Sequence, residues 1–324
     1  VVVMGLVCPV AGATEYTITE IDMIPGATSG NAYDISNSGV IVGRVSGAGI
    51  GTQAWRWTQA DGMVQLPLPS GSTGAQAFAL NDSGWVVGVS RSITSNWQAT
   101  IWAPGQAPRV LGAELNFPQY YVSSWLADVN NQGEMIGFYD LQPPGSSGIQ
   151  RHSFYWSEAT GLITIDGFST YGTTATGIDD SGVVVGHAQL NENRTHAFSW
   201  TPAGGIADIY PDFPNRDYVA LSINEAGQIV GQGEQGDGTK VPTLWLDPSG
   251  EPIFANIAYG WAEDINDNGL IVGRCSYTPS GPTREYAFLW DGATTFNVLP
   301  GLGGNREIAE GVNDDGWIVG WARN

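Results

Sequence analysis

The sequence predicts an all-β fold, a seven-bladed β-propeller of four-stranded antiparallel blades, and three observations carry this prediction. A turn-and-strand motif recurs seven times at intervals of 42 to 49 residues. Each copy is flanked by short runs in which apolar and polar residues alternate, and no segment keeps the 3.6-residue period of a helix. A four-stranded sheet of this length cannot bury both of its faces alone, whereas sheets arranged in a ring cover one another.

The repeated motif is a polar turn followed by a strand rich in valine and isoleucine, as in residues 81–88 (NDSGWVVG). Asn and Asp side chains bond the amides of their own turn, and the first glycine takes the positive φ that closes a bulged hairpin. The second glycine suits a place where neighbouring backbones crowd. The copies end at Gly43, Gly88, Gly137, Gly186, Gly231, Gly273 and Gly320.

Three further strand types complete each repeat. An alternating run precedes the turn, as in residues 32–36 (AYDIS), and an aromatic strand follows the motif, as in residues 53–57 (QAWRW). A polar turn then leads to an apolar strand such as residues 63–68 (MVQLPL). One tryptophan recurs at the end of the aromatic strand, and we interpret it as packing between blades; its copies are Trp57, Trp102, Trp156, Trp200, Trp245 and Trp290.

Two motifs carry a resemblance to a known family: HAFSW at His196–Trp200 and INDNGLIVG at Ile265–Gly273. In these the chain resembles the bacterial extracellular HAF-repeat family, over residues 15 to 321. Kelch and WD-repeat propellers share the period, but the repeat has neither the Gly-Gly pair that ends the second strand of the first nor the recurring Trp-Asp at a strand end of the second. The resemblance implies an exported protein with a propeller-like fold.

Residues 1–13 (VVVMGLVCPVAGA) are predicted to be a signal-peptide remnant, because an apolar run ends in Ala-Gly-Ala. Residues 14–324 then form one seven-bladed domain. The alternative is that the first residues supply the aromatic-type strand of the last blade, between residues 308–321 and 16–21. Under the signal-peptide interpretation that strand lies beyond Asn324.

Charge and cysteine content exclude several classes. The net charge is −20, from 32 acidic and 12 basic residues, so nucleic acid is excluded as a partner and anionic membranes are disfavoured. No apolar run is long enough to span a membrane. The cysteines are Cys8 and Cys275, and removal of residues 1–13 leaves only one, so disulfides do not hold the fold.

No cofactor is predicted. His152 and His196 occupy equivalent positions and are interpreted as structural, and His187 as a loop or surface residue, so zinc has little support. Calcium is the one metal with some support, because turns such as NDNG are rich in oxygen ligands. The full D-x-D-x-D-G pattern is absent.

The alternating strand directions place the variable loops after each second glycine, and the connections between blades, on one face. Variable loops on a rigid scaffold are where binding groups usually lie. Aromatic rings beside Asp and Arg suit sugar rings and their hydroxyls. The predicted ligand-binding residues on this face are Tyr120, Tyr121, Tyr139, Asp140, Tyr210, Arg216, Asp217, Tyr259, Trp261 and Arg306.

The sequence contains no Gly-x-Ser-x-Gly elbow and no P-loop, and we assign no catalytic residue. The expected function is that of a secreted, non-catalytic protein of the bacterial surface or matrix, which binds glycans or an extracellular protein. One alternative is a polysaccharide hydrolase or lyase, which needs buried carboxylates outside the repeat pattern. Another is a structural protein that self-assembles through an unpaired strand edge.

Overall fold

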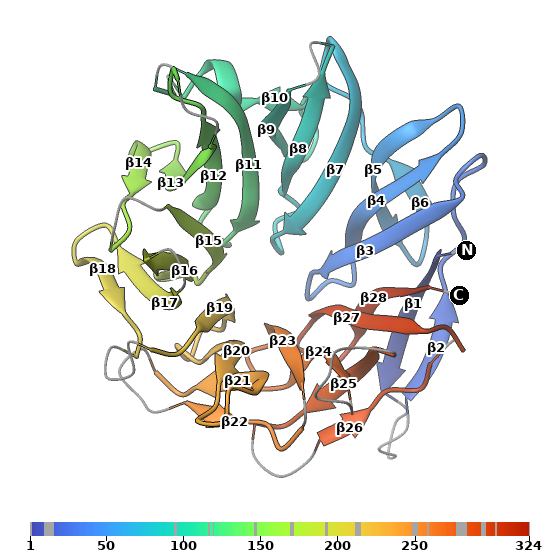
Figure 1. The fold of residues 1–324 in the computed structure, drawn as a ribbon. Helices are drawn as coiled ribbons and strands as arrows, with labels where there is room; N and C mark the ends of the chain where they lie inside the picture. Colours follow the sequence, from blue (N-terminus) through green and yellow to red (C-terminus); the bar gives the residue numbers. More distant parts are fainter. Residues whose placement is uncertain are drawn as a thin grey trace.

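The computed structural model describes residues 2–9, 16–93, 96–115, 117–118, 120–145, 148–168, 172–191, 194–210, 215–247, 252–257, 259–276, 284–292, 296–301 and 303–323. Within these ranges the chain forms β-strands and one short 3-10 helix, and no α-helix. Four-stranded antiparallel sheets stand around a central axis (Figure 1). The prediction of an all-β propeller is confirmed.

Six blades are each built from four strands that follow one another in the chain, since a short turn is enough to join antiparallel neighbours. Blade 1 comprises β3 (Ser29–Ile35), β4 (Ile41–Gly47), β5 (Gly51–Thr58) and β6 (Gly62–Gln65). Blade 2 comprises β7 (Ser72–Leu80), β8 (Val86–Ser92), β9 (Trp97–Trp102) and β10 (Arg109–Val110), followed by the 3-10 helix η1 (Leu111–Ala113). Blade 3 comprises β11 (Tyr121–Val129), β12 (Met135–Leu141), β13 (Gln150–Ser157) and β14 (Gly161–Ile165).

The second half of the chain repeats this order. Blade 4 comprises β15 (Thr173–Ile178), β16 (Val184–Asn191), β17 (Arg194–Thr201) and β18 (Gly205–Asp208). Blade 5 comprises β19 (Tyr218–Ile223), β20 (Ile229–Glu234), β21 (Lys240–Trp245) and β22 (Ile253–Phe254). Blade 6 comprises β23 (Tyr259–Ile265), β24 (Ile271–Ser276), β25 (Tyr286–Trp290) and β26 (Phe296–Val298).

A further sheet combines the two ends of the chain, and we call it the composite sheet. Its strand order is β2 (Tyr16–Glu20), β1 (Val2–Pro9), β28 (Ile318–Arg323) and β27 (Arg306–Val312). The termini therefore lie close together in Figure 1. β1 pairs along both edges, with β28 from Val2↔Arg323 and with β2 from Gly5↔Glu20. The chain start thus has the place that the closing-strand alternative gives it, and removal of residues 1–13 stays a prediction.

The inner strand of every sheet carries a β-bulge at the same place. In blade 1 Ala32 pairs with Gly43 and Asp34 with Val42, so Tyr33 has no partner in the ladder. The same irregularity occurs in β7, β11, β15, β19, β23 and β27. A bulge adds one residue to one strand and re-aims the side chains beside it. It therefore turns the bulged residue and its successor away from the normal alternation.

The second glycine of the motif lies opposite this bulge and is required by space. A Cβ at Gly43 would lie 2.0 Å from the Asn31 carbonyl oxygen, and one at Gly231 would lie 1.9 Å from that of Val219. The first glycine is needed for its conformation, as at Gly84, where φ is 82°. Both expectations for the glycines are confirmed.

The recurring tryptophan packs between blades, as the repeat predicts. Five of its six copies are buried, and Trp57 is half-buried. Trp102 contacts Val42 and Ala54 of blade 1, and its indole N–H donates to the Pro67 carbonyl oxygen at 2.8 Å. Removing an aromatic side chain from such a site usually costs about 3–5 kcal/mol. These contacts bind each sheet to its predecessor.

A closed series of hydrogen bonds joins the turns of consecutive sheets, and we call it the turn ring. The first turn position is Asn in five sheets, Ser36 in blade 1 and Asp179 in blade 4. The residue that follows it donates its backbone N–H to a side-chain oxygen at the equivalent place in the next sheet, over 2.7 to 3.0 Å. The donor–acceptor pairs are Asn37–Asp82, Asp82–Asn131, Asn131–Asp180, Asp180–Glu225, Glu225–Asp267, Asp267–Asp314 and Asp314–Asn37.

The turn asparagine itself adds a second link. Asn130 Oδ1 accepts from the N–H groups of Gln132 and Glu134 in its own turn, and its Nδ2 donates to the Asp179 carbonyl oxygen at 2.9 Å. Asn81, Asn224, Asn266 and Asn313 make the same bond to the next sheet. Ser36 and Asp179 stand at the equivalent positions without an amide to donate.

Exchanging Asn and Asp at two equivalent positions tests this link. Asn266→Asp keeps the turn acceptor but removes the donor to the Asn313 carbonyl oxygen, 2.7 Å away. We expect it to lower the free energy of unfolding by about 1–3 kcal/mol, because a buried acceptor loses its partner. Asp179→Asn adds a donor where blade 4 lacks one and should leave stability unchanged or higher. Urea denaturation measures both, and an equal loss in the two variants would contradict the assignment.

Candidate binding site on the loop face

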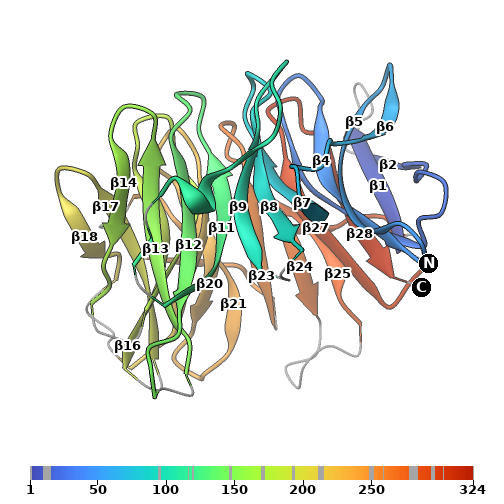
Figure 2. The ribbon, with the colours of Figure 1, turned by 90° about the horizontal axis from the view of Figure 1, so that it is seen from above.

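The strands run along the axis of the ring, so turns and loops gather at its two ends (Figure 2). The turn ring occupies one end, which we call the turn face. The other end, the loop face, carries the variable loops after each second glycine and the connections between blades. This arrangement follows from the antiparallel pairing of every strand with its successor within a blade.

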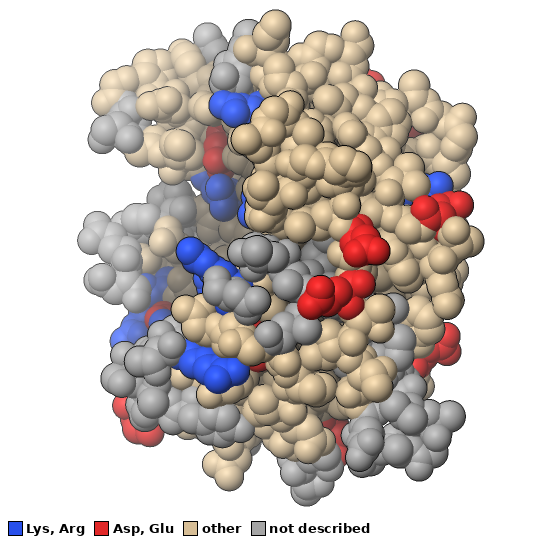
Figure 3. Space-filling model, turned by 90° about the vertical axis from the view of Figure 1, so that its right-hand side faces the viewer, with Lys and Arg blue, Asp and Glu red and all other residues tan. Residues whose placement is uncertain are grey.

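Charge is distributed unevenly between the two faces. Figure 3 shows Lys and Arg gathered toward one side of the view and most of the visible Asp and Glu toward the other. Arg151, Arg194, Lys240 and Arg306 stand at the beginnings of strands that start from the loop face. The turn ring is built largely from acidic residues. The sparse positive charge of this acidic chain is therefore concentrated where the loops vary.

Each of these four cations is paired with a carboxylate. Arg151 Nε lies 3.0 Å from Asp140 Oδ1, Arg194 Nη1 lies 3.1 Å from Glu234 Oε2, and Lys240 Nζ lies 2.7 Å from Asp217 Oδ2. Arg306 pairs with Glu285. Burial alone would raise the pKa of Asp217, but hydrogen bonds from Lys240 and the Thr195 amide outweigh it and lower that pKa. The loop face thus presents compensated pairs of donors and acceptors.

Aromatic rings accompany the guanidinium groups. Arg151 lies over Phe138 with its Cζ 4.2 Å from the ring centre, and Arg274 lies over Trp261 at 5.6 Å. Arg306 lies over Trp321 at 5.3 Å. Such stacking fixes the planar cation and leaves its edge for hydrogen bonds.

The predicted tyrosines differ in how accessible they are. Tyr120 is 47% exposed and has a φ of 75°, unusual for a residue with a side chain. Tyr121 is half-buried, stacks on Phe117 with ring centres 4.8 Å apart, and shares a hydrogen bond with Ser124. Tyr139 is only 3% exposed and packs against the same Phe117.

The remaining predicted residues form separate groups. Tyr210 and Arg216 both lie beside the buried Tyr218, adjoining Asp217. Tyr259 and Trp261 are half-buried on β23. Asp140, Asp217 and Arg306 take part in the ion pairs described above. The blade 3 group and the blade 5 and 6 groups lie in different sheets, so the predicted residues surround the loop face in several clusters.

One cavity on this face lies between blades 3 and 4, with a volume of about 410 Å³. Asp140 and Arg151 line it from blade 3, and Thr174, His187 and Thr195 line it from blade 4. Of these, only Asp140 belongs to the predicted set. The cavity therefore brings together polar residues that the sequence analysis left unassigned.

His187 was expected in a loop or at the surface, whereas the structure places it on a strand with its side chain half-buried. It lies on β16 directly after the motif glycine Gly186 and lines this cavity. Burial, aided by the charge of Arg151, lowers its pKa to about 4, so the ring is neutral at pH 7. The sequence did contain a signal for a polar strand residue at this position. Arg44 and Arg274 also directly follow the motif glycine of their own blades.

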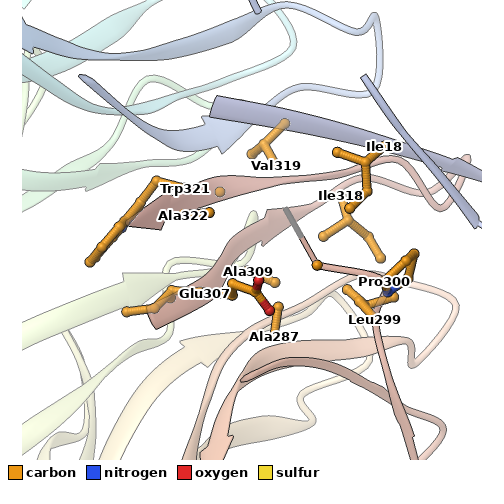
Figure 4. Close-up of a pocket in the computed structure, with 13 residues that line it drawn as sticks. Ile18, Ala287, Leu299, Pro300, Glu307, Ala309, Ile318, Val319, Trp321 and Ala322 are labelled. Atoms are coloured by element: carbon orange, nitrogen blue, oxygen red, sulfur yellow. The ribbon is translucent and has the colours of Figure 1, made fainter. Parts of the chain in front are cut away.

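A second cleft, between blade 6 and the composite sheet, is mainly apolar (Figure 4). Ile18, Leu299, Pro300 and Ile318 line it, and the buried Glu307 carboxylate reaches toward it. Its volume is about 40 Å³, well below the roughly 300 Å³ at which ligand pockets usually begin. We therefore regard it as a packing gap between sheets.

The turn face has a polar hollow of about 180 Å³ below the turn ring. Three aspartates that directly follow a bulged residue reach it, Asp34, Asp128 and Asp264. Each accepts a backbone N–H from the next sheet: Leu80 bonds Asp34 at 2.8 Å, Ile178 bonds Asp128 at 3.0 Å, and Val312 bonds Asp264 at 2.9 Å. Sequence reasoning missed these links, which hold consecutive sheets together.

Among the residues that the structure describes, no group of three or more His, Cys, Asp or Glu is placed to hold a metal ion. The oxygen-rich turns on which the calcium prediction rests use their side chains in the turn ring instead.

Two off-pattern carboxylates lie at the bulges of neighbouring sheets, Glu263 in blade 6 and Glu310 in the composite sheet. Glu263 Oε1 lies 3.1 Å from Arg274 Nε, and Glu310 accepts the Trp321 indole N–H at 2.6 Å. Burial first, and then the charge of Glu310, raise the pKa of Glu263 to about 7; burial also raises that of Glu310. The equivalent residues in the other blades are Tyr33, Phe78, Ala127, Thr176 and Leu221.

Comparison with known proteins gives the fold. No family model matches the chain, and no curated protein matches it. Among solved structures, the β-propeller domain of the Trilobed protease from Pyrococcus furiosus superposes with a TM-score of 0.60 at 12% identity, covering 93% of this chain and 95% of that one. That domain has an open velcro topology.

Longer proteins contain a similar ring. A puromycin hydrolase matches with a TM-score of 0.57 at 14% identity over 91% of this chain and 51% of its own. TolB from Acinetobacter baumannii matches with a TM-score of 0.51 at 12% identity over 93% of this chain and 68% of its own. The chain thus spans about half the length of the puromycin hydrolase. At these identities the likeness establishes the propeller fold.

No helix within the described ranges has the length and hydropathy needed to cross a membrane.

The half-buried aspartates Asp34 and Asp128 predict how stability depends on pH. Burial, with the charge of Asp264 added, raises the pKa of Asp34 to about 8, and burial raises that of Asp128 to about 6. A carboxyl whose pKa is higher in the folded chain stabilises the fold fully below about pH 4 and loses that contribution as pH rises through its folded pKa. We therefore expect a lower free energy of unfolding at pH 9 than at pH 5.

Denaturant unfolding at pH 5, 7 and 9 measures this dependence. Asp34→Asn should flatten the decline, whereas Asp61→Asn, at an exposed turn of the same blade, should leave it unchanged. A free energy of unfolding that rises from pH 5 to pH 9 would contradict the role given to these carboxyls.

Proposed function

We propose that the chain is a secreted, non-catalytic propeller of the bacterial surface or matrix that binds glycans through its loop face. The observation that carries this proposal is the set of Arg–carboxylate pairs and stacked aromatic rings around that face. A paired carboxylate accepts hydrogen bonds from sugar hydroxyls, and the guanidinium beside it donates to them. Aromatic faces that the cations leave uncovered suit the C–H faces of a sugar ring.

Export is part of the same proposal and rests on the resemblance to HAF-repeat proteins. An extracellular protein is the other partner compatible with this face, because protein interfaces are enriched in Arg, Tyr and Trp. We favour glycans because each of these cations is neutralised by a neighbouring carboxylate, and such paired charges suit a neutral ligand that carries many hydroxyl groups.

We also propose that the composite sheet is the seventh blade of the ring. Support comes from bonds that do not involve β1. The Asp314 N–H donates to Asn37 Oδ1 at 2.9 Å, and Asn313 Nδ2 donates to the Ser36 carbonyl oxygen at 3.1 Å. These bonds join the last inner strand to the first, and the backbone bond to a side-chain oxygen recurs at every other junction of the turn ring.

Removing one loop-face cation tests the binding proposal. Arg306→Ala should weaken glycan binding about tenfold or more, because a charge-assisted hydrogen bond contributes about 1.5–3 kcal/mol. The matched control is Arg56→Ala on the turn face, since both side chains are 41% exposed and each pairs with one carboxylate. Trp261→Ala and Tyr121→Ala extend the test to the aromatic groups.

Binding is measured on a glycan array and then by calorimetry with the best array ligand. Absence of glycan binding by the unmodified protein at millimolar concentration, or an equal loss in the Arg306 and Arg56 variants, would argue against the proposal. A protein partner would then be the next candidate.

A polysaccharide hydrolase or lyase is the second candidate, because Glu263 and Glu310 match what such an enzyme needs. Acid–base catalysis uses a carboxyl whose pKa lies near the working pH, commonly beside a second carboxylate. These two residues interrupt the repeat pattern in adjacent sheets, and each has a polar partner.

Under this second candidate, Glu263→Gln should lower hydrolysis of a polysaccharide substrate by about 10²–10⁴-fold, because it removes a titrating carboxyl without changing its shape. Reducing-end release and the formation of unsaturated products, measured on a panel of polysaccharides, separate hydrolase from lyase activity. Asp61→Asn, at the exposed turn of blade 1, serves as the control. Absence of activity in the unmodified protein across the panel would remove this candidate.

A further inference from the structure

We propose that the cavity between blades 3 and 4 is a subsite for one ring of a neutral sugar, with His187 and the Asp140–Arg151 pair as its polar contacts. The inference rests on the proposed glycan-binding function and names the place and the chemical class of the ligand.

The walls of this cavity come from rigid elements. Arg151 is the second residue of β13, His187 lies on β16, and Thr174 pairs with His187 across β15 and β16. Gly172 lines the cavity where the chain enters blade 4, with a φ of 107°, and a Cβ there would lie 2.5 Å from the Arg151 carbonyl oxygen. The cavity shape is therefore fixed by backbone contacts between two blades. Its volume of about 410 Å³ falls within the usual range of ligand pockets, roughly 300–1,000 Å³.

The charges in the cavity cancel. Arg151 donates two hydrogen bonds to Asp140, from Nε at 3.0 Å and from Nη2 at 3.3 Å. His187 is neutral at pH 7 because its pKa is lowered to about 4. A charged ligand would lose its hydration without gaining a net counter-charge, and Asp140 would repel an anion as Arg151 would repel a cation. The site therefore favours a neutral ligand.

The hydrogen-bonding groups suit hydroxyls. Asp140 supplies acceptor lone pairs, and Arg151 retains N–H groups that do not bond Asp140. Thr174 adds a hydroxyl to the lining. A ligand whose every polar group both donates and accepts can satisfy such a mixed set, and neighbouring hydroxyls on a sugar ring match the side-by-side carboxylate and guanidinium.

The His187 ring adds a specific donor. Its Nδ1 is buried and has no hydrogen-bond partner among the described residues. An unpaired buried N–H is rarer than an unpaired acceptor, so the proton belongs on Nε2. The ring then lines the cavity as a neutral Nε2–H donor on a fixed strand.

Replacing His187 by Phe separates binding from stability. The ring shape is kept and an unpaired buried nitrogen is removed, so the free energy of unfolding should be unchanged or higher. Sugar binding should weaken about fivefold or more, because one hydrogen bond of about 1 kcal/mol is lost. His152→Phe is the matched control, since His152 stacks on Tyr139 and does not line the cavity.

The probes are D-glucose, D-galactose and D-mannose, with D-glucuronate and D-glucosamine as charged analogues, titrated into the full chain. Side-chain ¹⁵N NMR follows the three histidines, which His152→Phe and His196→Phe assign. We expect at least one neutral sugar to shift the His187 signals and leave those of His152 in place, and the charged analogues to bind about tenfold more weakly.

The outcomes distinguish this inference from the proposed function. Suppose that glycans bind on the array, that no sugar shifts the His187 signals, and that His187→Phe binds as tightly as the unmodified protein. The subsite proposal is then overturned, while the proposal of glycan binding by the loop face is retained. If neither glycans nor single sugars bind, the proposed function fails as well. Equal binding of neutral and charged sugars would overturn the chemical class assigned to the cavity.

Discussion

The hydrogen bond from each turn to the next sheet is the constraint on which the rest of the structure depends. A single sheet has two apolar faces and cannot exist alone in water, so its stability comes from its neighbours. Tryptophan packing buries apolar surface but does not fix the geometry between sheets. The hydrogen bond from the Asn37 amide to Asp82 does fix how far one turn lies from the next. Repeated around the ring, it sets the spacing and tilt of every inner strand, and it returns to its start at Asp314.

The bulge follows from the same constraint. With the turns held together at one end, the inner strands crowd, and an extra residue lets each strand bend while its outer part stays paired. Gly43 must then lack a side chain, because the Asn31 carbonyl oxygen occupies that space. The residue after the bulge is turned toward the next sheet, and Asp34 uses this position to accept the Leu80 amide. Turn, bulge, glycine and aspartate therefore form one structural unit.

Much of this fold could be predicted, because each repeat records its strands and turns locally. The glycines and the recurring tryptophan were assigned correctly from spacing alone. What the sequence could not show is the partner of each polar group, since Asn130 bonds a residue 49 positions away. His187 was misassigned because a lone histidine after a strand motif looks like a loop residue. Glu263 and Glu310 were overlooked because a bulge changes where a side chain points, and alternation does not reveal a bulge.

The division between the two ends explains where variation is tolerated. At the turn face the turn ring and the turn asparagines hold consecutive sheets together, so a change at these positions costs stability. The residue that follows the second motif glycine lies where the strand backbone is already fixed. Its identity differs from sheet to sheet: Arg44, Val89, Phe138, His187, Gln232, Arg274 and Trp321. Such diversity at a geometrically equivalent site means that packing does not dictate the side chain there. A repeat protein acquires specificity at positions of this kind, because they can change one blade at a time while the ring remains closed.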